Sequence, residues 1–282
     1  MTRSLRVERT IDGLRAAIRD LRREGRSIGL APTMGALHAG HISLIEAAEA
    51  RGDAAVATLF VNPTQFGANE DLAAYPKDEA ADFAMLERAG AALVFAPDVA
   101  EMYPEPGLTT VSVAGLTDGL CGPLRPGHFA GVATVVAKLF LIALPDRAYF
   151  GEKDFQQLQV VKRMARDLNM PVEVLGCPTV REPDGLAMSS RNRYLSCDER
   201  AVAATMFAAL QDLAAQARSG ADLRSAEREA AAWLIAAGFA SVDYVQVVDC
   251  ETLAPAPSLA RPARALAAAR LGRTRVIDNV AV

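Results

Sequence analysis

The chain has 282 residues, of which 51% are hydrophobic, 23% charged and 6% aromatic, and its formal net charge is −4. At ~100–200 residues per domain, this length predicts one large or two modest domains with a sizeable hydrophobic core. The composition excludes disordered, collagen-like and coiled-coil chains, and the acidic balance argues against a nucleic-acid or membrane partner, because both are held by clustered Lys and Arg.

The first part of the sequence, up to about residue 175, alternates between helix-like and strand-like patterns. An amphipathic helix comes first, with apolar residues at helical spacing from Ile11 to Leu21. The elements predicted after it are strand 27–31 closed by Pro32, helix 42–50, strand 54–61, helix 78–89, strand 91–95, helix 128–144, strand 147–150, helix 155–168 and strand 172–175. Strands separated by helices imply parallel β-α-β crossovers. We therefore predict an α/β fold with an open, doubly wound (Rossmann-like) parallel sheet.

The pattern changes after a segment rich in Pro, Gly and Ser at 176–192. Two Ala-rich helices are predicted at 198–218 and 223–237, and strands at 241–248, 264–271 and 274–278. We therefore predict a Rossmann-like domain over 1–179 and a smaller C-terminal α+β domain over 180–282. The longest apolar run, 132–144, is broken by Lys138 and is too short to span a bilayer, and no secretory signal is visible. These features predict a soluble, cytoplasmic protein.

Two of the three histidines lie between the first Rossmann strand and the next helix, in His38-Ala39-Gly40-His41. In an open parallel sheet, ligands bind at the carboxyl ends of the strands, and a helix beginning near Ala39 would aim its N–H groups at an anion there. Because positions i and i+3 share a helix face, His38 and His41 can point to one phosphate. The alternative is a pair of structural histidines near a helix cap, and the spacing after a strand favours the functional pair.

The segment His38–His41 resembles the H-x-G-H signature of the nucleotidyltransferase superfamily. The longer string PTMGALHAGH, residues 32–41, resembles the pantothenate synthetase (pantoate–β-alanine ligase) family. Further matching strings follow in the expected order: FVNPTQF (60–66), AYPK (74–77), EMYP (101–104), RPGHFAGV (125–132), YFGEKD (149–154) and MSSRN (188–192). The resemblance implies that ATP and Mg²⁺ are used to join D-pantoate to β-alanine through a pantoyl-adenylate. Pyrophosphate and then AMP are released, in a step of coenzyme A precursor biosynthesis.

The resemblance also assigns roles to residues of this chain. Lys153 matches a lysine that contacts ATP phosphates, and 188–191 resembles the mobile K-M-S-K-S-type loop, whose hydroxyls and guanidinium suit a phosphate clamp. Asp154 is expected near the nucleotide, although a helix-opening Asp is equally an ordinary N-cap. The implied catalytic residues are His38, His41, Lys153, Ser189, Ser190 and Arg191. The implied ATP contacts are these residues together with Pro32, Thr33, Met34, Gly40, Gly151, Asp154, Val180 and Met188.

Two glutamines correspond to the residues that hold pantoate, Gln65 and Gln157, and Gln65 is also implied at the β-alanine site. Amide side chains can donate to a carboxylate and bond a hydroxyl, which suits a hydroxy acid. His128 is expected either to take part in the site or simply to cap or pack at the start of its helix. Tyr75 and Lys77 lie in a matching string, and Tyr75 is equally a candidate core aromatic.

No set of magnesium ligands can be assigned from the sequence. Ala81 and Met85 occupy the helix after Lys77, so an acidic pair is missing there and Asp82 is the nearest carboxylate. We therefore expect ATP phosphates and water to hold most of the metal's coordination shell.

The implied chemistry needs no protein nucleophile, because the pantoate carboxylate is ionised at neutral pH and can itself attack the α-phosphorus. Catalysis then depends on positioning and on donors for the charge that develops on phosphoryl oxygens. One alternative is a nucleotidyltransferase that adenylylates a phosphate-bearing small molecule, and another is a nucleotide-binding regulator without catalysis. The glutamine pair and the intact set of cationic residues favour the ligase. The resemblance further implies a homodimer formed through an ATP- and pantoate-binding N-terminal domain, with the C-terminal domain as a lid.

Overall fold

The computed structural model of the chain describes residues 5–67, 72, 75–76, 78–105 and 107–282. Ala74 and Lys77, from the string at 74–77, lie outside the described residues. The chain divides into two compact units, one of residues up to Glu152 with Gln157–Pro178, and one of Lys153–Gln156 with Thr179–Val282. The roles expected of an N-terminal and a lid domain stay predictions.

The first unit is built on a six-stranded parallel sheet with the order β1-β4-β3-β2-β5-β6. Its strands are β1 (Arg6–Glu8), β2 (Ile28–Thr33), β3 (Ala54–Leu59), β4 (Leu93–Phe95), β5 (Arg147–Gly151) and β6 (Glu173–Cys177). The order runs outward from β2 to β4 on one side and from β5 to β6 on the other. The carboxyl ends of β2 and β5 therefore flank the switch point, where open α/β sheets bind ligands.

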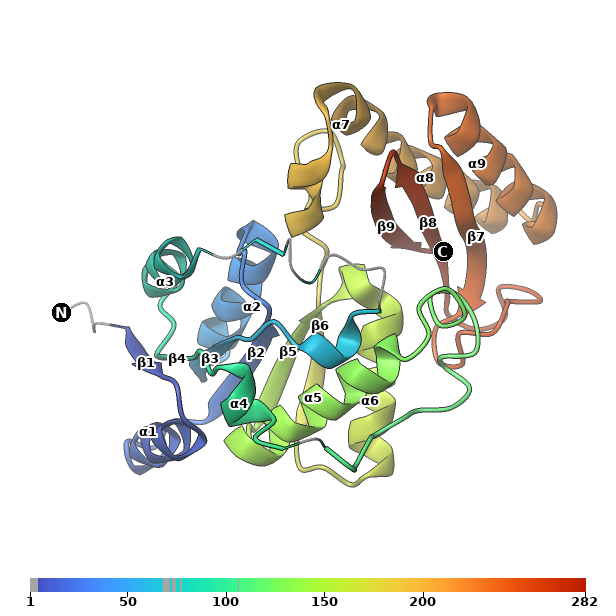
Figure 1. Cartoon of the computed structure of the whole chain (residues 1–282). Helices are drawn as coiled ribbons and strands as arrows, with labels where there is room; N and C mark the ends of the chain where they lie inside the picture. The colour runs from blue at the N-terminus through green and yellow to red at the C-terminus, as the bar shows by residue number, and fades with distance from the viewer. Residues whose placement is uncertain (1–4, 68–71, 73–74, 77, 106) are drawn as a thin grey trace. The chain divides into compact units, whose positions relative to one another are not determined.

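Helices cover both faces of this sheet, which confirms the predicted doubly wound fold (Figure 1). On one face lie α2 (Ala39–Ala50) and α3 (Glu79–Arg88), and on the other lie α1 (Ile11–Arg23), α5 (His128–Ala143) and α6 (Phe155–Asp167). The short helix α4 (Val99–Met102) and the 3-10 turns η1 (Pro63–Gln65) and η2 (Glu152–Asp154) lie in the connections. Among the described residues, no helix is long and apolar enough to cross a membrane.

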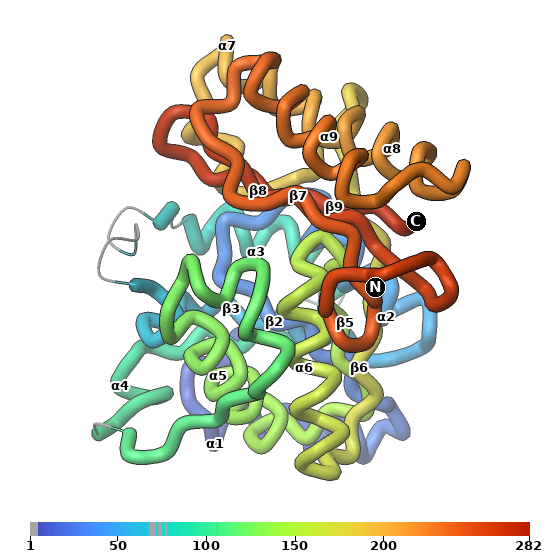
Figure 2. Tube along the Cα trace, turned by 90° about the vertical axis from the view of Figure 1, so that its right-hand side faces the viewer, coloured from blue at the N-terminus to red at the C-terminus, as the bar shows by residue number. Residues whose placement is uncertain are grey.

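The second unit is a three-stranded antiparallel sheet of β7 (Ser241–Asp249), β8 (Ala263–Leu271) and β9 (Thr274–Ala281). The helices α8 (Thr205–Arg218) and α9 (Leu223–Ala237) run side by side along this sheet (Figure 2). The core between them is made largely of Ala and Leu, including Leu210, Leu213 and Leu234. The 3-10 turn η3 (Ser190–Tyr194) and the helix α7 (Cys197–Ala203) precede α8.

Three local predictions differ from the structure. The strand expected to end at Ala31 continues through Pro32 to Thr33, because the missing N–H of Pro32 lies on the β5 side, past the last residue pair with that strand. The single helix expected over 198–218 is two helices that meet at Ala204, where neither Gly nor Pro marks a break. The elements β1 and α4 were not predicted, because they have three and four residues and are too short to show a period.

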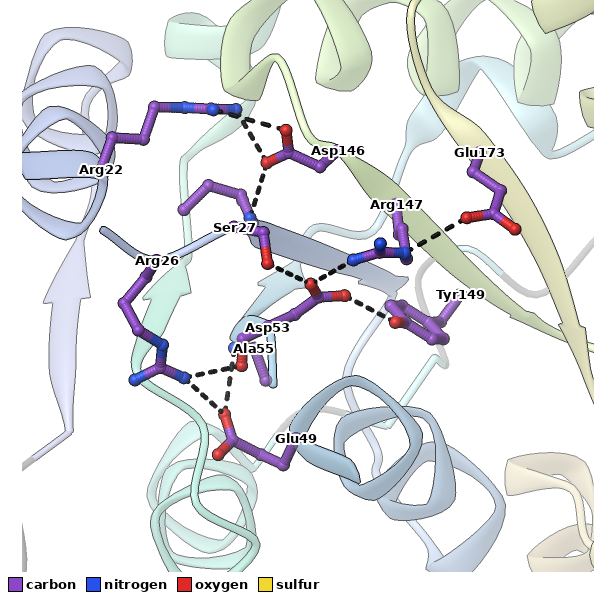
Figure 3. Close-up of polar contacts among 11 residues, drawn as sticks. Arg22, Arg26, Ser27, Glu49, Asp53, Ala55, Asp146, Arg147, Tyr149 and Glu173 are labelled. Atoms are coloured by element: carbon purple, nitrogen blue, oxygen red, sulfur yellow. Dashed lines mark hydrogen bonds and ion pairs between the residues drawn. The ribbon is translucent and has the colours of Figure 1, made fainter. Parts of the chain in front are cut away.

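A buried polar cluster ties the amino ends of the central strands together (Figure 3). Asp53 is fully buried and accepts hydrogen bonds from the hydroxyls of Ser27 and Tyr149 (2.6 Å for Tyr149). It also forms an ion pair with Arg147 (2.6 Å). Burial raises the pKa of the Tyr149 phenol far above its usual value, and the hydrogen bond to Asp53 raises it further. This cluster holds β2, β3 and β5 in register at their amino ends, opposite to the carboxyl ends where ligands bind.

Candidate active site

The turn between β2 and α2 is fixed by a buried carboxylate. The two oxygens of Asp82, which is 4% exposed, accept hydrogen bonds from the main-chain N–H groups of Ala36 (2.9 Å) and Leu37 (2.8 Å). Gly35 and Ala36 have φ values of +81° and +51°. Glycine adopts such left-handed values readily, but alanine does so only where the surrounding structure supports it. Asp82 therefore supports the turn that leads directly into His38.

The carboxyl end of β2 carries three predicted ATP contacts, Pro32, Thr33 and Met34. The Thr33 hydroxyl donates to the carbonyl of Thr58 and accepts from the N–H of Gly35 (3.3 Å), so it holds the strand end in place. The half-buried Met34 accepts a contact from the Gln65 amide at its sulfur (3.0 Å). The structure thus brings Met34, from the predicted ATP string, next to Gln65, from the predicted pantoate set.

The two histidines form the N-terminal cap of α2, as the sequence placed them. The N–H of Gly40 donates to Nδ1 of His38 (3.1 Å), and the N–H of His38 donates to Nδ1 of His41 (3.3 Å). Their ring centroids lie 4.1 Å apart. A backbone N–H can only donate, so each Nδ1 accepts and each neutral ring carries its proton on Nε2. The pair therefore presents two Nε2–H groups, which are suitable donors for phosphate oxygens.

This capping changes one detail of the sequence prediction. We expected the N–H groups at the start of α2 to point to an anion. The N–H of Gly40 is instead bonded to the His38 ring, and the N–H of His41 is bonded to the His38 carbonyl (2.8 Å). The imidazoles thus replace these two N–H groups as candidate anion donors, because the rings themselves serve as the cap.

Gln65 lies in the 3-10 turn η1 and is 9% exposed, with its side-chain amide oriented by Asn62. Nδ2 of Asn62 donates to Oε1 of Gln65 (3.2 Å) and to the carbonyl of Gly131 (3.2 Å). Oδ1 of Asn62 accepts from the hydroxyls of Thr64 (3.0 Å) and Tyr103 (2.9 Å). Because Oε1 of Gln65 is the acceptor for Asn62, its Nε2 is turned toward Met34 as a donor.

His128 holds the main chain of the same turn. Its Nδ1 lies 2.8 Å from the carbonyl of Gln65, and its Nε2 lies 2.9 Å from a guanidinium nitrogen of Arg125. A carbonyl only accepts and a guanidinium only donates, so Nδ1 carries the proton and Nε2 accepts. His128 therefore contacts the main-chain carbonyl of Gln65, while the N-cap of α5 is Gly127, without a side-chain hydrogen bond. A part for His128 in the site stays a prediction.

Asn62 and Asp82 are functional candidates that reasoning from the sequence missed. Asn62 was visible only as a member of a matching string, and the pair Asn62-Pro63 is a typical start of a short turn. Asp82 was considered only as a metal ligand. The partners of both residues lie up to 69 positions away in the sequence, so these contacts exist only in the folded chain.

Other predicted residues of the first unit have simpler surroundings. Gly151 ends β5, and Gln157 lies half-buried on α6. Tyr75 is buried and packs edge-on against Phe66, with ring centroids 6.1 Å apart, as expected for a core aromatic.

Lys153 and Asp154 follow β5 along the chain and group with the second unit. Nζ of Lys153 lies 3.7 Å from a carboxylate oxygen of Asp154, and the Lys153 side chain is only 18% exposed. The main-chain carbonyl of Lys153 accepts a hydrogen bond from Asn279 on β9 (2.9 Å). The lysine is therefore held in a defined place and is not a solvated surface residue.

The predicted loop is the end of a small hairpin in the second unit. The N–H of Met188 donates to the carbonyl of Val180 (3.0 Å), and Arg181 pairs with Ala187 in an isolated antiparallel bridge. Ser189 caps η3 by accepting from the N–H of Arg191 (3.3 Å), while Ser190 is buried. The structure thus brings Val180 next to Met188, and it keeps Ser189 in contact with Arg191.

The structure groups the predicted site residues in two sets. The first unit brings His38, His41, Met34 and Gln65 onto neighbouring turns, and the second unit holds Lys153 together with the loop 188–191. The convergence of these two sets stays a prediction. The described residues contain no group of three or more His, Cys, Asp or Glu that could hold a metal ion. Among the described residues, Asp82, the carboxylate nearest to the predicted position, uses both of its oxygens to accept backbone N–H groups.

Comparison with known proteins decides the family. A family model described as Pantoate-beta-alanine ligase matches residues 6–281. The chain belongs to this family. The family resemblance seen in the sequence is thereby confirmed over nearly the whole chain.

Named relatives agree with the family. The chain is 57% identical over 282 residues to a pantothenate synthetase from Paramagnetospirillum magneticum, covering 100% of this chain and 99% of the relative. It is 54% identical to a pantothenate synthetase from Rhizorhabdus wittichii, over 99% of each chain.

Solved structures of the pantoate–β-alanine ligase family share the fold. The crystal structure of pantothenate synthetase from Thermus thermophilus has a TM-score of 0.92 and 48% identity and covers 98% of both chains. A pantoate-β-alanine ligase from Francisella tularensis, complexed with "Beta-gamma ATP" and β-alanine, has a TM-score of 0.82 and 31% identity. It covers 98% of this chain and 97% of that chain.

Proposed function

We propose that this chain catalyses the ATP-dependent condensation of D-pantoate with β-alanine to give pantothenate, AMP and pyrophosphate. The observation that carries this function is the match to the pantoate–β-alanine ligase family over residues 6–281. The Francisella tularensis relative, complexed with "Beta-gamma ATP" and β-alanine, supports ATP and β-alanine as ligands of this chain. The comparisons favour the ligase over a nucleotidyltransferase that adenylylates a phosphate-bearing molecule.

The reaction takes place in two steps. A carboxylate oxygen of pantoate attacks the α-phosphorus of ATP, the bond to the β-phosphate oxygen breaks, and pyrophosphate leaves. The amine of β-alanine then attacks the acyl carbon of the pantoyl-adenylate, loses a proton, and expels AMP. Neither step forms a bond to the protein, so the residues of the chain act by binding, orienting and donating hydrogen bonds.

We assign the phosphate contacts to groups whose orientation the fold fixes. The Nε2–H groups of His38 and His41 would donate to phosphate oxygens, because their Nδ1 atoms are committed to the cap of α2. Lys153 and the group Ser189, Ser190 and Arg191 would stabilise the charge that develops as pyrophosphate leaves. The remaining ATP contacts proposed are Pro32, Thr33, Met34, Gly40, Gly151, Asp154, Val180 and Met188.

We assign pantoate to Gln65 and Gln157, and we place β-alanine next to Gln65. The support for Gln65 is the fixed orientation of its amide, which Asn62 holds through Oε1 so that Nε2 is the donor for a carboxylate or hydroxyl. Mg²⁺ would reach the site with the ATP phosphates and would supply charge neutralisation there, with water completing its coordination shell.

We further propose an ATP- and pantoate-binding domain over 1–179, a lid domain over 180–282, a homodimer formed through the first domain, and a cytoplasmic location. The division of the chain into two compact units supports the two-domain proposal. The homodimer rests on the family resemblance, and its test is the molar mass of the purified protein in solution.

The products test the proposed function directly. Purified protein, ATP, Mg²⁺, pantoate and β-alanine should give pantothenate, AMP and pyrophosphate in equal amounts, and no AMP should form when pantoate is left out. Formation of ADP, or release of pyrophosphate with AMP retained on a phosphate-bearing acceptor, would contradict the ligase.

A further inference from the structure

The last strand of the second unit carries two buried polar residues in succession. Asp278 is 4% exposed and Asn279 is 3% exposed, and both lie in β9, where they pair with Ala267 and Leu266 of β8. Successive residues of a strand point to opposite faces of the sheet. Buried polar side chains need partners, and each of these two residues finds one in a segment that the proposed function places at the ATP phosphates.

Asn279 holds the segment that contains Lys153. Its Nδ2 donates to the main-chain carbonyl of Lys153 (2.9 Å), across 126 positions of sequence. The guanidinium of Arg264, on the neighbouring strand β8, stacks over the ring of Phe155 at 4.4 Å from its centroid. These contacts explain why residues 153–156 group with the second unit, although the chain on either side of them belongs to the first.

Asp278 holds the hairpin that ends in the loop 188–191. Its two carboxylate oxygens accept from the guanidinium of Arg181 at 2.6 and 2.9 Å, and this guanidinium stacks over Phe207 of α8 at 3.7 Å. Burial raises the pKa of Asp278, and the Arg181 guanidinium opposes that shift by favouring the carboxylate. Arg181 also donates to the carbonyl of Gly185 at the tip of the hairpin (3.0 Å).

Arg181 is directly connected to the loop residues. It forms the bridge with Ala187, and the flanking Val180 accepts from the N–H of Met188, one residue before Ser189. Arg181 also donates to the main-chain carbonyl of Asn279 (3.3 Å), so the two anchors on β9 share a partner. Both segments proposed to contact phosphate are therefore fixed to adjacent residues of one strand.

We propose that Asp278 and Asn279 are positioning residues that fix Lys153 and the loop 188–191 to one strand, so that these phosphate-binding groups act as a single rigid set. The proposal rests on the proposed function, because it takes ATP as the ligand of both segments. Donors that are already oriented stabilise a transition state without reorganisation, and a displacement of about 1 Å can cost about 100-fold in rate. Two successive strand residues that are both buried are suitable anchors for such a set.

Hydrogen–deuterium exchange of the full-length protein tests the shared anchor. Asp278→Asn removes the charge that holds Arg181, and it should speed amide exchange in residues 181–191 and also in residues 153–156. The matched control is Asp243→Asn, which breaks the ion pair between Asp243 and Arg275 (2.6 Å) at the other end of β9. If Asp278→Asn sped exchange only in 181–191, or if the control had the same effect on 153–156, the proposal would be overturned.

Kinetics test whether Asn279 acts through Lys153. In pantoate-dependent exchange of pyrophosphate into ATP, Asn279→Ala should lower kcat/KM for ATP by about 10-fold or more, with the KM for pantoate changed by less than about 2-fold. In a Lys153→Ala background the same substitution should have an effect of about 2-fold or less, because the residue through which it acts is gone. Equal effects in both backgrounds would refute the positioning role.

Two further measurements distinguish failure of the positioning role from misfolding of the variant and from failure of the proposed function. If Asn279→Ala does not fold, as judged by thermal unfolding, Asn279→Gln retains an amide donor, and its smaller loss in kcat/KM for ATP should likewise disappear in the Lys153→Ala background. If the wild-type protein shows no pantoate-dependent exchange, the proposed function fails, whereas the hydrogen-exchange result reports on the anchor alone.

Discussion

Replacing Gly131 with Ala tests how closely α5 must approach the turn that carries Gln65. A Cβ at position 131 would lie 2.6 Å from the carbonyl carbon of Thr64 and 2.7 Å from the amide nitrogen of Gln65. Ordinary contact for such atoms is ~3.5 Å, so the helix and the turn must separate by roughly 1 Å. Both obstructing groups are main chain and cannot rotate away, which means that the displacement must reach Gln65 itself.

We expect Gly131→Ala to lower kcat/KM for pantoate much more than it lowers the free energy of unfolding. Overpacking costs about 1–3 kcal/mol of unfolding free energy, and exchanging a helical Gly for Ala returns about 1 kcal/mol through the helix preference of Ala. The net change in unfolding free energy is thus at most about 2 kcal/mol. A displacement of about 1 Å at a substrate-positioning residue, by contrast, can cost about 100-fold in kcat/KM for pantoate.

The assay is pantoate-dependent pyrophosphate–ATP exchange at varied pantoate, with urea unfolding measured on the same samples. The matched control is Gly119→Ala, because a Cβ at Gly119 meets nothing within 4 Å and its φ is not positive. Gly131→Ala should lose about 100-fold in kcat/KM for pantoate, and the control should stay within about 2-fold of wild type. Wild-type kinetics in Gly131→Ala would refute the inference that this close approach positions Gln65.

Three other substitutions have outcomes that follow from single contacts. Lys153→Ala should lower pantoate-dependent exchange by ~10²–10³-fold with unchanged thermal unfolding, and a normal exchange rate would remove Lys153 from the phosphate contacts. Asp82→Asn keeps one of the two acceptors for the N–H groups of Ala36 and Leu37, so urea unfolding should show a loss of about 1–3 kcal/mol, and an unchanged free energy would contradict the clamp. The raised pKa of Tyr149 means that the unfolded chain releases its proton first, so wild-type stability should fall above about pH 10 by up to about 1.4 kcal/mol per pH unit. Tyr149→Phe should lack this contribution to the fall of stability with pH. The same pH dependence of stability in both proteins would contradict a raised pKa of Tyr149.

The fold was largely predictable because its signals are local. The strands of the parallel sheet are short apolar runs between helices with clear periods, and α3, α5 and α9 begin and end within one residue of the predicted limits. The elements that escaped prediction are those whose existence depends on tertiary contacts. The three residues of β1 form a strand because they pair with β4, almost 90 positions later in the sequence.

The sequence allowed us to predict which residues form the candidate site, but not most of the contacts that orient their side chains. The spacing of His38 and His41 gave their shared place at a helix start, but not that both Nδ1 atoms turn back into the cap. The contacts of Asn62 with Gly131 and of Asn279 with Lys153 join positions far apart in the sequence, so no local pattern carries them. For the same reason, the grouping of Lys153 with the second unit could be found only from the folded chain.

The proposed reaction depends on attack of the pantoate carboxylate on the α-phosphorus of ATP. The most direct test uses pantoate labelled with ¹⁸O in its carboxylate, turned over with ATP, Mg²⁺ and β-alanine, and analysed by mass spectrometry of the nucleotide product. We predict AMP that carries one ¹⁸O atom, because the oxygen that attacks phosphorus stays with AMP when the amine of β-alanine displaces AMP from the acyl carbon. Unlabelled AMP, or ADP together with ¹⁸O-labelled phosphate, would contradict the pantoyl-adenylate and with it the roles proposed for the phosphate-binding residues.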